Sequence, residues 1–486
     1  MSIKLLDKSL LRTQSYINGQ WIDSDNHIDV IDPSSELPIA SVAKMNAIQT
    51  NQAIESAEQA LSLWQNKSAK ERSNLLRAWF DLIIKNKDDL ARILTAEQGK
   101  VLAEATGEIL YGASYIEWFA EEAKRNYGDT IPAPSPDKRI VCIKQPVGVV
   151  ACITPWNFPN AMLTRKIAPA LAAGCTVVCK PASETPLSAL ALAELADRAG
   201  IPKGVINILI GDSKQVGPCL TDNPKVRKLT FTGSTQVGKK LVEACAKTLK
   251  KTSMELGGNA PFIIFDDADL DAAIDGLLAS KYRNSGQTCV CTNRILVQSS
   301  IASTFTKKLV DAVKSRLVLG EGTQKSVTNG PLINSKACQD VDRLVKSAVS
   351  QGATVELGGE ISELGKCFYP PTVISGVTND MDIAQEEVFG PIASLIHFDN
   401  EQQAIKLAND TNVGLAAYFY TRDIGRVWRV GEALEYGIVG INEGVISNEM
   451  APFGGIKESG SGREGSKYGM DDYLEIKYMC IGGIEK

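Results

Sequence analysis

The chain has 486 residues, 44% hydrophobic and 22% charged, which predicts two or three packed units and argues against extensive disorder. Its 52 basic and 57 acidic residues are interspersed and give a formal net charge of −5, which argues against a nucleic-acid-binding surface. No apolar stretch reaches the roughly 18 residues of a membrane span, and the N-terminus lacks a signal-peptide core, so we expect a cytoplasmic protein.

Helix and strand signals alternate along the chain without an internal repeat. Apolar residues recur at helical spacing over residues 53–64, and Ser68-Ala-Lys-Glu71 predicts a capping box at the start of the next helix. Thr176–Cys179 predicts a short buried strand, and Thr185 predicts the cap of a helix that ends at Gly200. This pattern is typical of an α/β protein with largely parallel sheets, whose ligands bind beyond the carboxyl ends of the strands.

Two loop segments carry candidate binding groups. The first, Thr154-Pro-Trp-Asn157-Phe-Pro159, holds an amide between two prolines, which favours a rigid half of an oxyanion hole. In the second, Lys228–Ser234 predicts a strand and turn, and Gly233 and Gly238 bracket a helix N-terminus that can receive a pyrophosphate. The second is not a P-loop, because a lysine replaces the magnesium-binding hydroxyl. Taken alone, each segment is equally consistent with a structural turn.

A buried strand is predicted at Phe262–Phe265, and Asp267, Asp269 and Asp271 follow it. These aspartates do not form a calcium loop, because the sixth and twelfth positions are alanine and leucine. We expect them at the start of a helix, where negative charge is favoured.

A base and a thiol complete the candidate site. Glu255 precedes two glycines, and Cys289 ends the segment Gly286-Gln-Thr-Cys289, where we expect a loop-to-helix junction whose dipole favours the thiolate. The two histidines are far apart, so we expect no metal site and no Cys–His pair, and Glu255 is the candidate base for acyl transfer. The eleven cysteines contain no Cys-x-x-Cys pair, and we expect them to be reduced.

These segments, in this order and at these separations, resemble the aldehyde dehydrogenase superfamily from about Ile17 to the C-terminus. Further matching motifs are Lys180-Pro-Ala, Glu387-Val-Phe389-Gly-Pro and Pro452-Phe-Gly-Gly455. Within the superfamily the chain is most similar to the succinate-semialdehyde dehydrogenases, through Tyr282-Arg-Asn-Ser-Gly-Gln-Thr-Cys-Val-Cys291, Gly414-Leu-Ala-Ala-Tyr-Phe-Tyr420 and Gly462-Arg-Glu-Gly-Ser-Lys-Tyr-Gly469.

The resemblance implies an α/β fold with three parts: a Rossmann-like cofactor domain, an α/β catalytic domain and a small β arm for oligomerisation. It assigns residues 1–125 and 145–257 to the NAD(P)-binding domain, 258–472 to the catalytic domain, and 126–144 and 473–486 to the arm. By analogy, the chain forms a homodimer or homotetramer and binds neither nucleic acid nor membrane.

The resemblance also implies a mechanism. Cys289 attacks the aldehyde, the amide of Asn157 and the backbone N–H of Cys289 hold the oxyanion, and a thioester remains after hydride transfer. Glu255 then activates water, and Lys166 and Glu464 relay the proton away. The positions that match cofactor contacts are Thr154, Pro155, Trp156, Lys180, Ser183, Gly233, Ser234, Gly238, Glu255, Leu256, Glu387 and Phe389.

One position bears on the choice of cofactor. NAD-preferring relatives often carry a glutamate three residues after the lysine, and Ser183 stands there. A small neutral residue does not repel a 2′-phosphate, and Lys180 can pair with it, so NADP is favoured over NAD. Glu184 follows directly and keeps NAD open.

Arg165 and Arg283 match the arginines that hold the substrate carboxylate, and Ser447 matches their hydroxyl partner. The expected reaction is the oxidation of succinate semialdehyde to succinate. Glutarate semialdehyde, which is one methylene longer, and a broader range of aldehydes remain alternatives. Cys291 matches a position that forms a reversible disulfide with the nucleophile in some of these enzymes, and a core cysteine is an equally good interpretation.

Two other classes of function remain. A cofactor-independent thiol hydrolase would use Cys289 and Glu255 and would not need the Lys180 or Glu387-Val-Phe389 motifs. A redox-sensing or structural protein on the same fold would not need Cys289, Glu255 and Asn157 together. The full set of motifs therefore favours the dehydrogenase.

Overall fold

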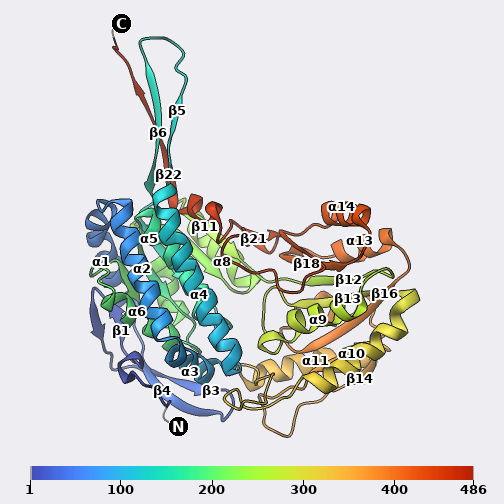
Figure 1. Cartoon of the computed structure of the whole chain (residues 1–486). Coiled ribbons are helices and arrows are strands. Elements are labelled where there is room, and N and C mark those ends of the chain that lie inside the picture. Colours follow the sequence, from blue (N-terminus) through green and yellow to red (C-terminus); the bar gives the residue numbers. More distant parts are fainter. Residues whose placement is uncertain (1–2, 485–486) are drawn as a thin grey trace.

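The chain forms two α/β lobes and a projecting arm in the computed structural model, which describes residues 3–484 (Figure 1). The sheet of the first lobe has eight strands, in the order β2 (Gln20–Ile22), β1 (Ser15–Ile17), β9 (Ile206–Ile208), β8 (Thr176–Lys180), β7 (Val149–Ile153), β10 (Val226–Thr232), β11 (Lys251–Glu255) and β21 (Gly460–Ser461). The five strands from β9 to β11 run parallel, and β1 and β21 join them antiparallel. The predicted α/β class with largely parallel strands is confirmed.

Helices cover both faces of this sheet. Side chains alternate along each strand, so each strand contributes apolar residues to both faces. In β7, Val150 and Cys152 pack into the larger core, whereas Val149 and Ala151 pack into the smaller one. The larger core includes α2 (Ala69–Lys85), α3 (Lys87–Gln98), α4 (Leu102–Glu122), α5 (Ala161–Ala173) and α6 (Leu187–Arg198). The smaller core includes α1 (Ala47–Gln65), α7 (Ser213–Asp222) and α8 (Thr235–Ala246).

Of the two helix starts that the sequence predicts in this lobe, one is confirmed and one is wrong. The capping box of Ser68 and Glu71 is present at the start of α2. Thr185 does not cap α6, because the carboxylate of Glu97 accepts the N–H groups of Leu187 at 2.6 Å and Ser188 at 2.8 Å. A cap supplied by α3, about 90 residues away, leaves no local signal in the sequence.

The second lobe is built on a seven-stranded sheet that also has helices on both faces. Its order is β14 (Thr354–Leu357), β15 (Thr372–Ser375), β16 (Ile392–Phe398), β13 (Thr292–Gln298), β12 (Ala260–Ile264), β18 (Ala416–Tyr420) and β19 (Ile438–Ile441). The helices are α9 (Leu270–Lys281), α10 (Ala302–Arg316), α11 (Ser335–Ser350), α12 (Asp382–Gln385), α13 (Glu401–Asn409) and α14 (Ile424–Ala433). Two-stranded sheets, β3 (His27–Asp32) with β4 (Leu37–Ala43) and β17 (Val413–Gly414) with β20 (Ile456–Lys457), flank the lobes.

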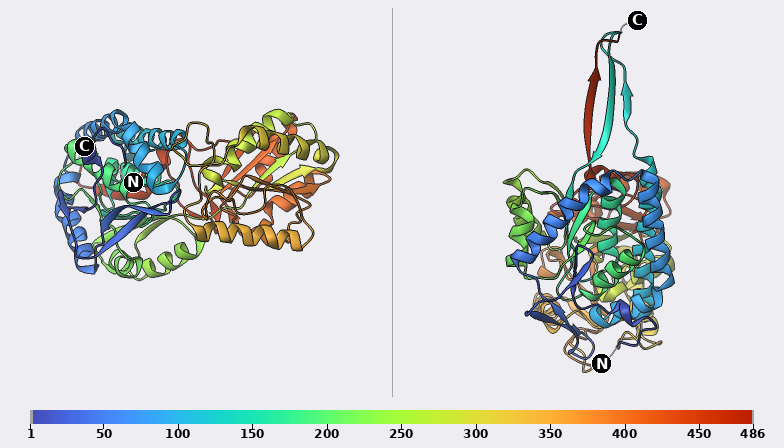
Figure 2. Two further views of the ribbon diagram at one scale, coloured as in Figure 1. Left: turned by 90° about the horizontal axis from the view of Figure 1, so that it is seen from below. Right: turned by 90° about the vertical axis from the view of Figure 1, so that its left-hand side faces the viewer.

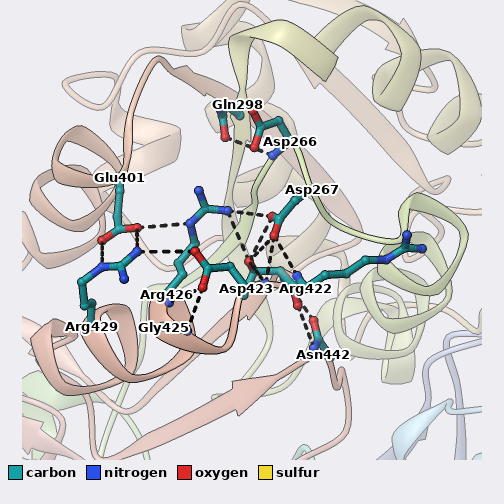
Figure 3. A network of polar contacts seen from close by, with 11 residues as sticks. Asp266, Asp267, Gln298, Glu401, Arg422, Asp423, Gly425, Arg426, Arg429 and Asn442 are labelled. Atoms are coloured by element: carbon teal, nitrogen blue, oxygen red, sulfur yellow. Dashed lines mark hydrogen bonds and ion pairs between the residues drawn. The ribbon is translucent and has the colours of Figure 1, made fainter.

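The aspartates after β12 have two different roles. Asp269 caps α9 by accepting the N–H groups of Asp271 and Ala272, as predicted for the start of a helix. Asp267 instead accepts the N–H groups of Arg422 and Asp423 and an ion pair from Arg426 at 2.7 Å (Figure 3). Asp267 therefore holds the start of α14 against the end of β12.

A three-stranded sheet forms the arm, which projects from the first lobe in Figure 1 and in the right-hand view of Figure 2. It consists of β5 (Asp129–Ile131), β6 (Arg139–Pro146) and β22 (Leu474–Ile481), and β6 pairs antiparallel with both neighbours. Before it forms β22, the chain returns from the second lobe through β21 and the short helix η5 (Lys467–Tyr473). Within residues 3–484, no helix is long and apolar enough to cross a membrane.

Candidate active site

Four parallel strands of the first lobe end at one edge of the sheet, and each leads into a predicted site segment. Residues 154–157 follow β7, Lys180 ends β8, Gly233 and Ser234 follow β10, and Glu255 ends β11. The carboxyl ends of neighbouring parallel strands meet at the same edge, so segments far apart in the sequence become neighbours.

A pocket of about 260 Å³ lies at this edge and is closed by loops of the second lobe. Thirteen of the predicted site residues line it: Pro155, Trp156, Asn157, Arg165, Gly233, Ser234, Glu255, Leu256, Arg283, Cys289, Glu387, Phe389 and Ser447. The others lie outside its lining: Thr154, Lys166, Lys180, Ser183, Gly238, Cys291 and Glu464. The predicted nucleophile, base, amide and both arginines thus share one cavity.

Cys289 does not stand at the start of a helix, so the predicted helix-dipole activation is wrong. It follows the short helix η3 (Arg283–Gly286), in which Asn284 and Ser285 have positive φ values of 51° and 53°. The strand β13 begins at Thr292, directly after the cysteine loop. Left-handed residues of this kind are strained and occur often at functional sites, and they turn this loop toward the pocket.

The thiol of Cys289 is protonated at neutral pH in this structure. Burial raises its pKa to about 12, and the carboxyl groups of Glu387 and Glu255 act in the same direction. The guanidinium groups of Arg165 and Arg283 partly oppose this rise. The thiol must therefore lose its proton before its sulfur can attack an aldehyde.

The backbone around the nucleophile is held on two sides. Gly258 passes so close to the carbonyl oxygen of Cys289 that any side chain at this position would collide with it. The hydroxyl of Tyr418 donates to the carbonyl of Val290 at 2.8 Å from the core of the second lobe. These contacts fix the position of the thiol relative to β12 and β18.

The side-chain amide of Asn157 is oriented by the nucleophile loop itself. Its Nδ2 donates to the carbonyl of Gln287 at 3.0 Å, which leaves one N–H free for a ligand. The backbone carbonyl of Asn157 accepts from Asn284 Nδ2 at 3.0 Å and from Lys100 Nζ at 2.8 Å. Lys100 is buried and also pairs with Glu108 at 2.6 Å, so α4 connects both loops of the site.

Behind the base lies a buried cluster of charges. Burial and the carboxylate of Glu464 raise the pKa of Glu255 well above its usual range. Although burial opposes it, the cations of Lys166 and Arg165 lower the pKa of Glu464. Glu464 pairs with Lys166 and, at 2.8 Å, with Arg165. The pKa values of the two carboxyl groups are thus shifted in opposite directions, upward for Glu255 and downward for Glu464.

The two predicted carboxylate-binding arginines have different surroundings. The guanidinium of Arg165 is buried and stacks over Phe453 at 4.1 Å, in addition to its ion pair with Glu464. Arg283 is half-buried and makes no ion pair or side-chain hydrogen bond to any residue within 3–484. It lies 5.4 Å from the ring of Phe158.

The predicted dinucleotide contacts follow the same edge. Lys180 is buried and lacks an ion pair or hydrogen bond from its ammonium within the part of the chain that the structure describes. Glu387 accepts the N–H of Gly258 at 3.1 Å. Phe389, at a positive φ of 49°, lies edge-on to Trp156 with ring centroids 5.5 Å apart. A buried cation, a glycine-opened helix and two aromatic rings together fit a dinucleotide.

Several pocket residues were not predicted from the sequence. They are Tyr111, Phe158, Met162, Thr232, Gly257, Thr288, Val290 and Phe453. Tyr111 lies on α4 and Met162 on α5. An aromatic or methionine side chain on a helix is normally part of the core, so the sequence does not mark these two residues as pocket residues. Cys291 is buried behind the nucleophile with its thiol 3.4 Å from the carbonyl of Lys281, and all eleven cysteines are unpaired.

Comparison with known proteins gives consistent matches over nearly the whole chain. The model of the aldehyde dehydrogenase family matches residues 21–479. The succinate-semialdehyde dehydrogenase [NADP(+)] of Escherichia coli is 59% identical over 482 residues, which cover 99% of this chain and 100% of that protein. The glutarate-semialdehyde dehydrogenase of Pseudomonas aeruginosa is 59% identical over 484 residues, with the same coverage. The crystal structure of succinate-semialdehyde dehydrogenase from Burkholderia pseudomallei superimposes with a TM-score of 0.97 at 58% identity, covering 99% of this chain and 100% of that one.

Proposed function

The chain belongs to the aldehyde dehydrogenase family, and we propose that it oxidises succinate semialdehyde to succinate with NADP as the electron acceptor. The observation that carries this proposal is one pocket that holds Cys289 and Glu255 together with Arg165, Arg283 and Ser447. The thiol and base suit the aldehyde end of the substrate. The guanidinium groups suit a carboxylate at its other end, because their planar forks match its two oxygens.

In the proposed acylation, Cys289 gives its proton to solvent water, and its sulfur then bonds to the aldehyde carbon. The developing oxyanion is held by the free N–H of the Asn157 amide and the backbone N–H of Cys289. A dinucleotide held by Glu387 and Phe389 would supply the acceptor for the hydride that leaves the carbon. The carbonyl then re-forms as a thioester on Cys289.

In the proposed deacylation, Glu255 accepts a proton from water, whose oxygen attacks the thioester carbon. The carbon–sulfur bond breaks and succinate leaves, and the sulfur of Cys289, which departs as a thiolate, takes a proton from solvent to restore the thiol. Glu464 and Lys166, which lie behind the base, provide a route for its proton. A base with a raised pKa suits this step, because it binds the proton of water more readily.

NADP is the preferred cofactor in this proposal because of the end of β8. Lys180 is a buried cation without a partner among residues 3–484, and Ser183 adds no charge near it. Glu387 and Phe389 would hold the nicotinamide end, with Gly233 and Ser234 beside the pyrophosphate. NAD is the alternative, because Glu184 lies next to Ser183 and is exposed.

Glutarate semialdehyde is the second candidate substrate. It carries the same two functional groups, and the relative from Pseudomonas aeruginosa is named for it at the same 59% identity as the succinate-semialdehyde enzyme. One methylene changes transition-state binding by only about 1–3 kcal/mol. We therefore expect the two substrates to differ in kcat/KM without either being excluded.

The proposal extends to the assembly of the protein. Its proposed parts are a cofactor domain (1–125 and 145–257), a catalytic domain (258–472) and an arm (126–144 and 473–486). The arm exposes the apolar side chains of Ile476, Tyr478 and Ile481, which supports a homodimer or homotetramer built through it. Eleven unpaired cysteines support a cytoplasmic location.

The test is a kcat/KM panel of carboxylate semialdehydes with three to six carbons, each measured with NADP and with NAD. We expect the highest value for succinate semialdehyde with NADP, and a much lower value for butanal, which has the same length without the carboxylate. Equal values for butanal and succinate semialdehyde would contradict the proposal. Aldehyde turnover without reduction of the dinucleotide would favour a thiol hydrolase instead.

A further inference from the structure

Two tyrosines on α4 form a hydroxyl pair beside the pocket. Tyr111 and Tyr115 are four residues apart, so they share one face of the helix. Their hydroxyl oxygens are 3.1 Å apart, and their rings pack edge to face with centroids 5.2 Å apart. Tyr111 lines the pocket, whereas Tyr115 is fully buried behind it.

The pair links two groups that face the substrate carboxylate in the proposed function. At one end, Nη1 of Arg165 donates to the hydroxyl oxygen of Tyr111 at 3.3 Å. At the other end, the hydroxyl of Tyr115 donates to the carbonyl of Asn448 at 3.1 Å, directly after Ser447. Arg165 on α5 and the loop that carries Ser447 are thus both attached to α4.

The number of available protons fixes the direction of these bonds. The carbonyl of Asn448 only accepts, so the single proton of Tyr115 is used there. Tyr111 must therefore donate its own proton to the oxygen of Tyr115 and accept from Arg165. No hydroxyl proton of the pair is left for a ligand, so the pair orients other groups and does not bind the substrate itself.

Close packing leaves little freedom around the pair. Gly112 lies so near the side chain of Asn160 that no Cβ would fit, which keeps α4 tight against α5. The backbone of Gly465 passes close to the ring of Tyr115. The loop after Ser447 is held further by the side chain of Asn448, which accepts the N–H groups of Met450 and Ala451.

We infer that the Tyr111–Tyr115 hydroxyl pair is a positioning device that sets the separation of Arg165 and Ser447, and thereby the length of semialdehyde that the pocket accepts. This inference rests on the proposed function, because it assumes that these two residues face the substrate carboxylate. Loss of either hydroxyl would free one end of the pair and relax the choice between substrates that differ by one methylene.

The test compares Tyr111→Phe, Tyr115→Phe and the double variant with the wild type. The readout is the ratio of kcat/KM between the best semialdehyde and the one a methylene longer or shorter. We expect each variant to lower this ratio about threefold to tenfold, the size expected for one hydrogen bond. The effect should lie in KM, while kcat and the KM for butanal stay near wild type.

A matched control and the double variant separate positioning from simple packing. Tyr16→Phe removes a partly buried hydroxyl hydrogen bond of 2.7 Å to Asp197, away from the residues that line the pocket, and should leave the ratio unchanged. Because the two hydroxyls act as one unit, the double variant should lower the kcat/KM ratio no further than either single variant does.

The outcomes that would overturn the inference are distinct. Unchanged ratios in both variants, or additive losses, would show that the pair does not set substrate length. A loss of hundreds-fold in Tyr111→Phe with a normal Tyr115→Phe would show that Tyr111 binds the carboxylate directly. If the wild type itself does not prefer carboxylate semialdehydes over butanal, the proposed function fails, and this inference fails with it.

Discussion

The two walls of the pocket each supply an arginine, and they are organised in opposite ways. The wall of α4 and α5 holds Arg165 by an ion pair with Glu464, a stacked Phe453 and the hydroxyl of Tyr111. The wall formed by the cysteine loop presents Arg283 without an ion pair or hydrogen bond to residues 3–484. One cation is neutralised within the protein, and the other has its charge available for a ligand.

The pocket combines a rigid wall, which carries Arg165, with a binding wall, which carries Arg283. A buried guanidinium that already has its counter-ion keeps the pocket wall and the Glu464 cluster in place. A half-buried guanidinium without a counter-ion favours an anionic ligand, because the ligand supplies the missing charge. The glutamate next to this loop, Glu104, accepts the N–H of Asn284 and orients the backbone that carries Arg283.

The largest expected effect is on the cysteine-loop wall. Arg283→Ala should lower kcat/KM for succinate semialdehyde by hundreds-fold or more, because an unpaired buried carboxylate is unfavourable by about 3–5 kcal/mol. Butanal turnover and the melting temperature should change little, and Arg283→Lys should restore only part of the loss. Equal losses for both aldehydes in a normally folded variant would show that Arg283 does not bind the carboxylate.

The same change on the opposite wall should act on the fold as well. Arg165→Ala leaves Glu464 with one of its two cations, so we expect the free energy of unfolding to fall by about 3 kcal/mol. Turnover of butanal should fall because the cluster behind Glu255 is disturbed, and turnover of succinate semialdehyde should fall further because Arg165 also faces its carboxylate. Denaturant unfolding beside the two-substrate assay measures both effects. A variant as stable as the wild type would contradict the difference between the walls.

The raised pKa of Cys289, which lies between the two walls, predicts how its reactivity depends on pH. With its pKa raised to about 12, Cys289 is almost entirely protonated at pH 7 in the free enzyme. Its alkylation by iodoacetamide should therefore accelerate about tenfold for each pH unit between 7 and 10, because only the thiolate reacts. Cys289→Ala gives the background from the other cysteines. A rate that levels off below pH 9 would show that the free enzyme already holds a thiolate.

The smallest expected effect concerns the cofactor. Ser183→Glu should move the kcat/KM preference toward NAD about tenfold, because the new carboxylate would repel a 2′-phosphate near Lys180. The substrate preference should not change, since Ser183 lies outside the pocket that holds the arginines. Ser183→Gln is the matched control of similar size without charge. A wild type that already prefers NAD strongly would show that Ser183 does not have this role.

Much of the site could be predicted from the sequence because its groups stand in short motifs at strand ends. The resemblance to the aldehyde dehydrogenase family is confirmed by the matches over residues 21–479. Contacts between distant segments could not be predicted in this way. The cap of α6 by Glu97, the clamp of Lys100 on Asn157 and the hydroxyl pair of Tyr111 all depend on how helices pack.

The wrong prediction for Cys289 has a similar cause. The motif Gly-Gln-Thr-Cys was expected to open a helix, but the chain runs on from the cysteine loop into β13. The local sequence shows a glycine-rich turn and does not show which element follows. The thiol is therefore surrounded by pocket charges and not by a helix N-terminus.

A pre-steady-state burst experiment tests most directly whether a thioester forms on Cys289 and is hydrolysed with the help of Glu255. Glu255→Gln is mixed with succinate semialdehyde and NADP, quenched in acid and analysed by peptide mass spectrometry. We predict one NADPH formed rapidly per active site, a slow steady state, and a succinyl group on the peptide that contains Cys289. The same adduct in Cys289→Ala, or undiminished NADPH formation by that variant, would contradict the account.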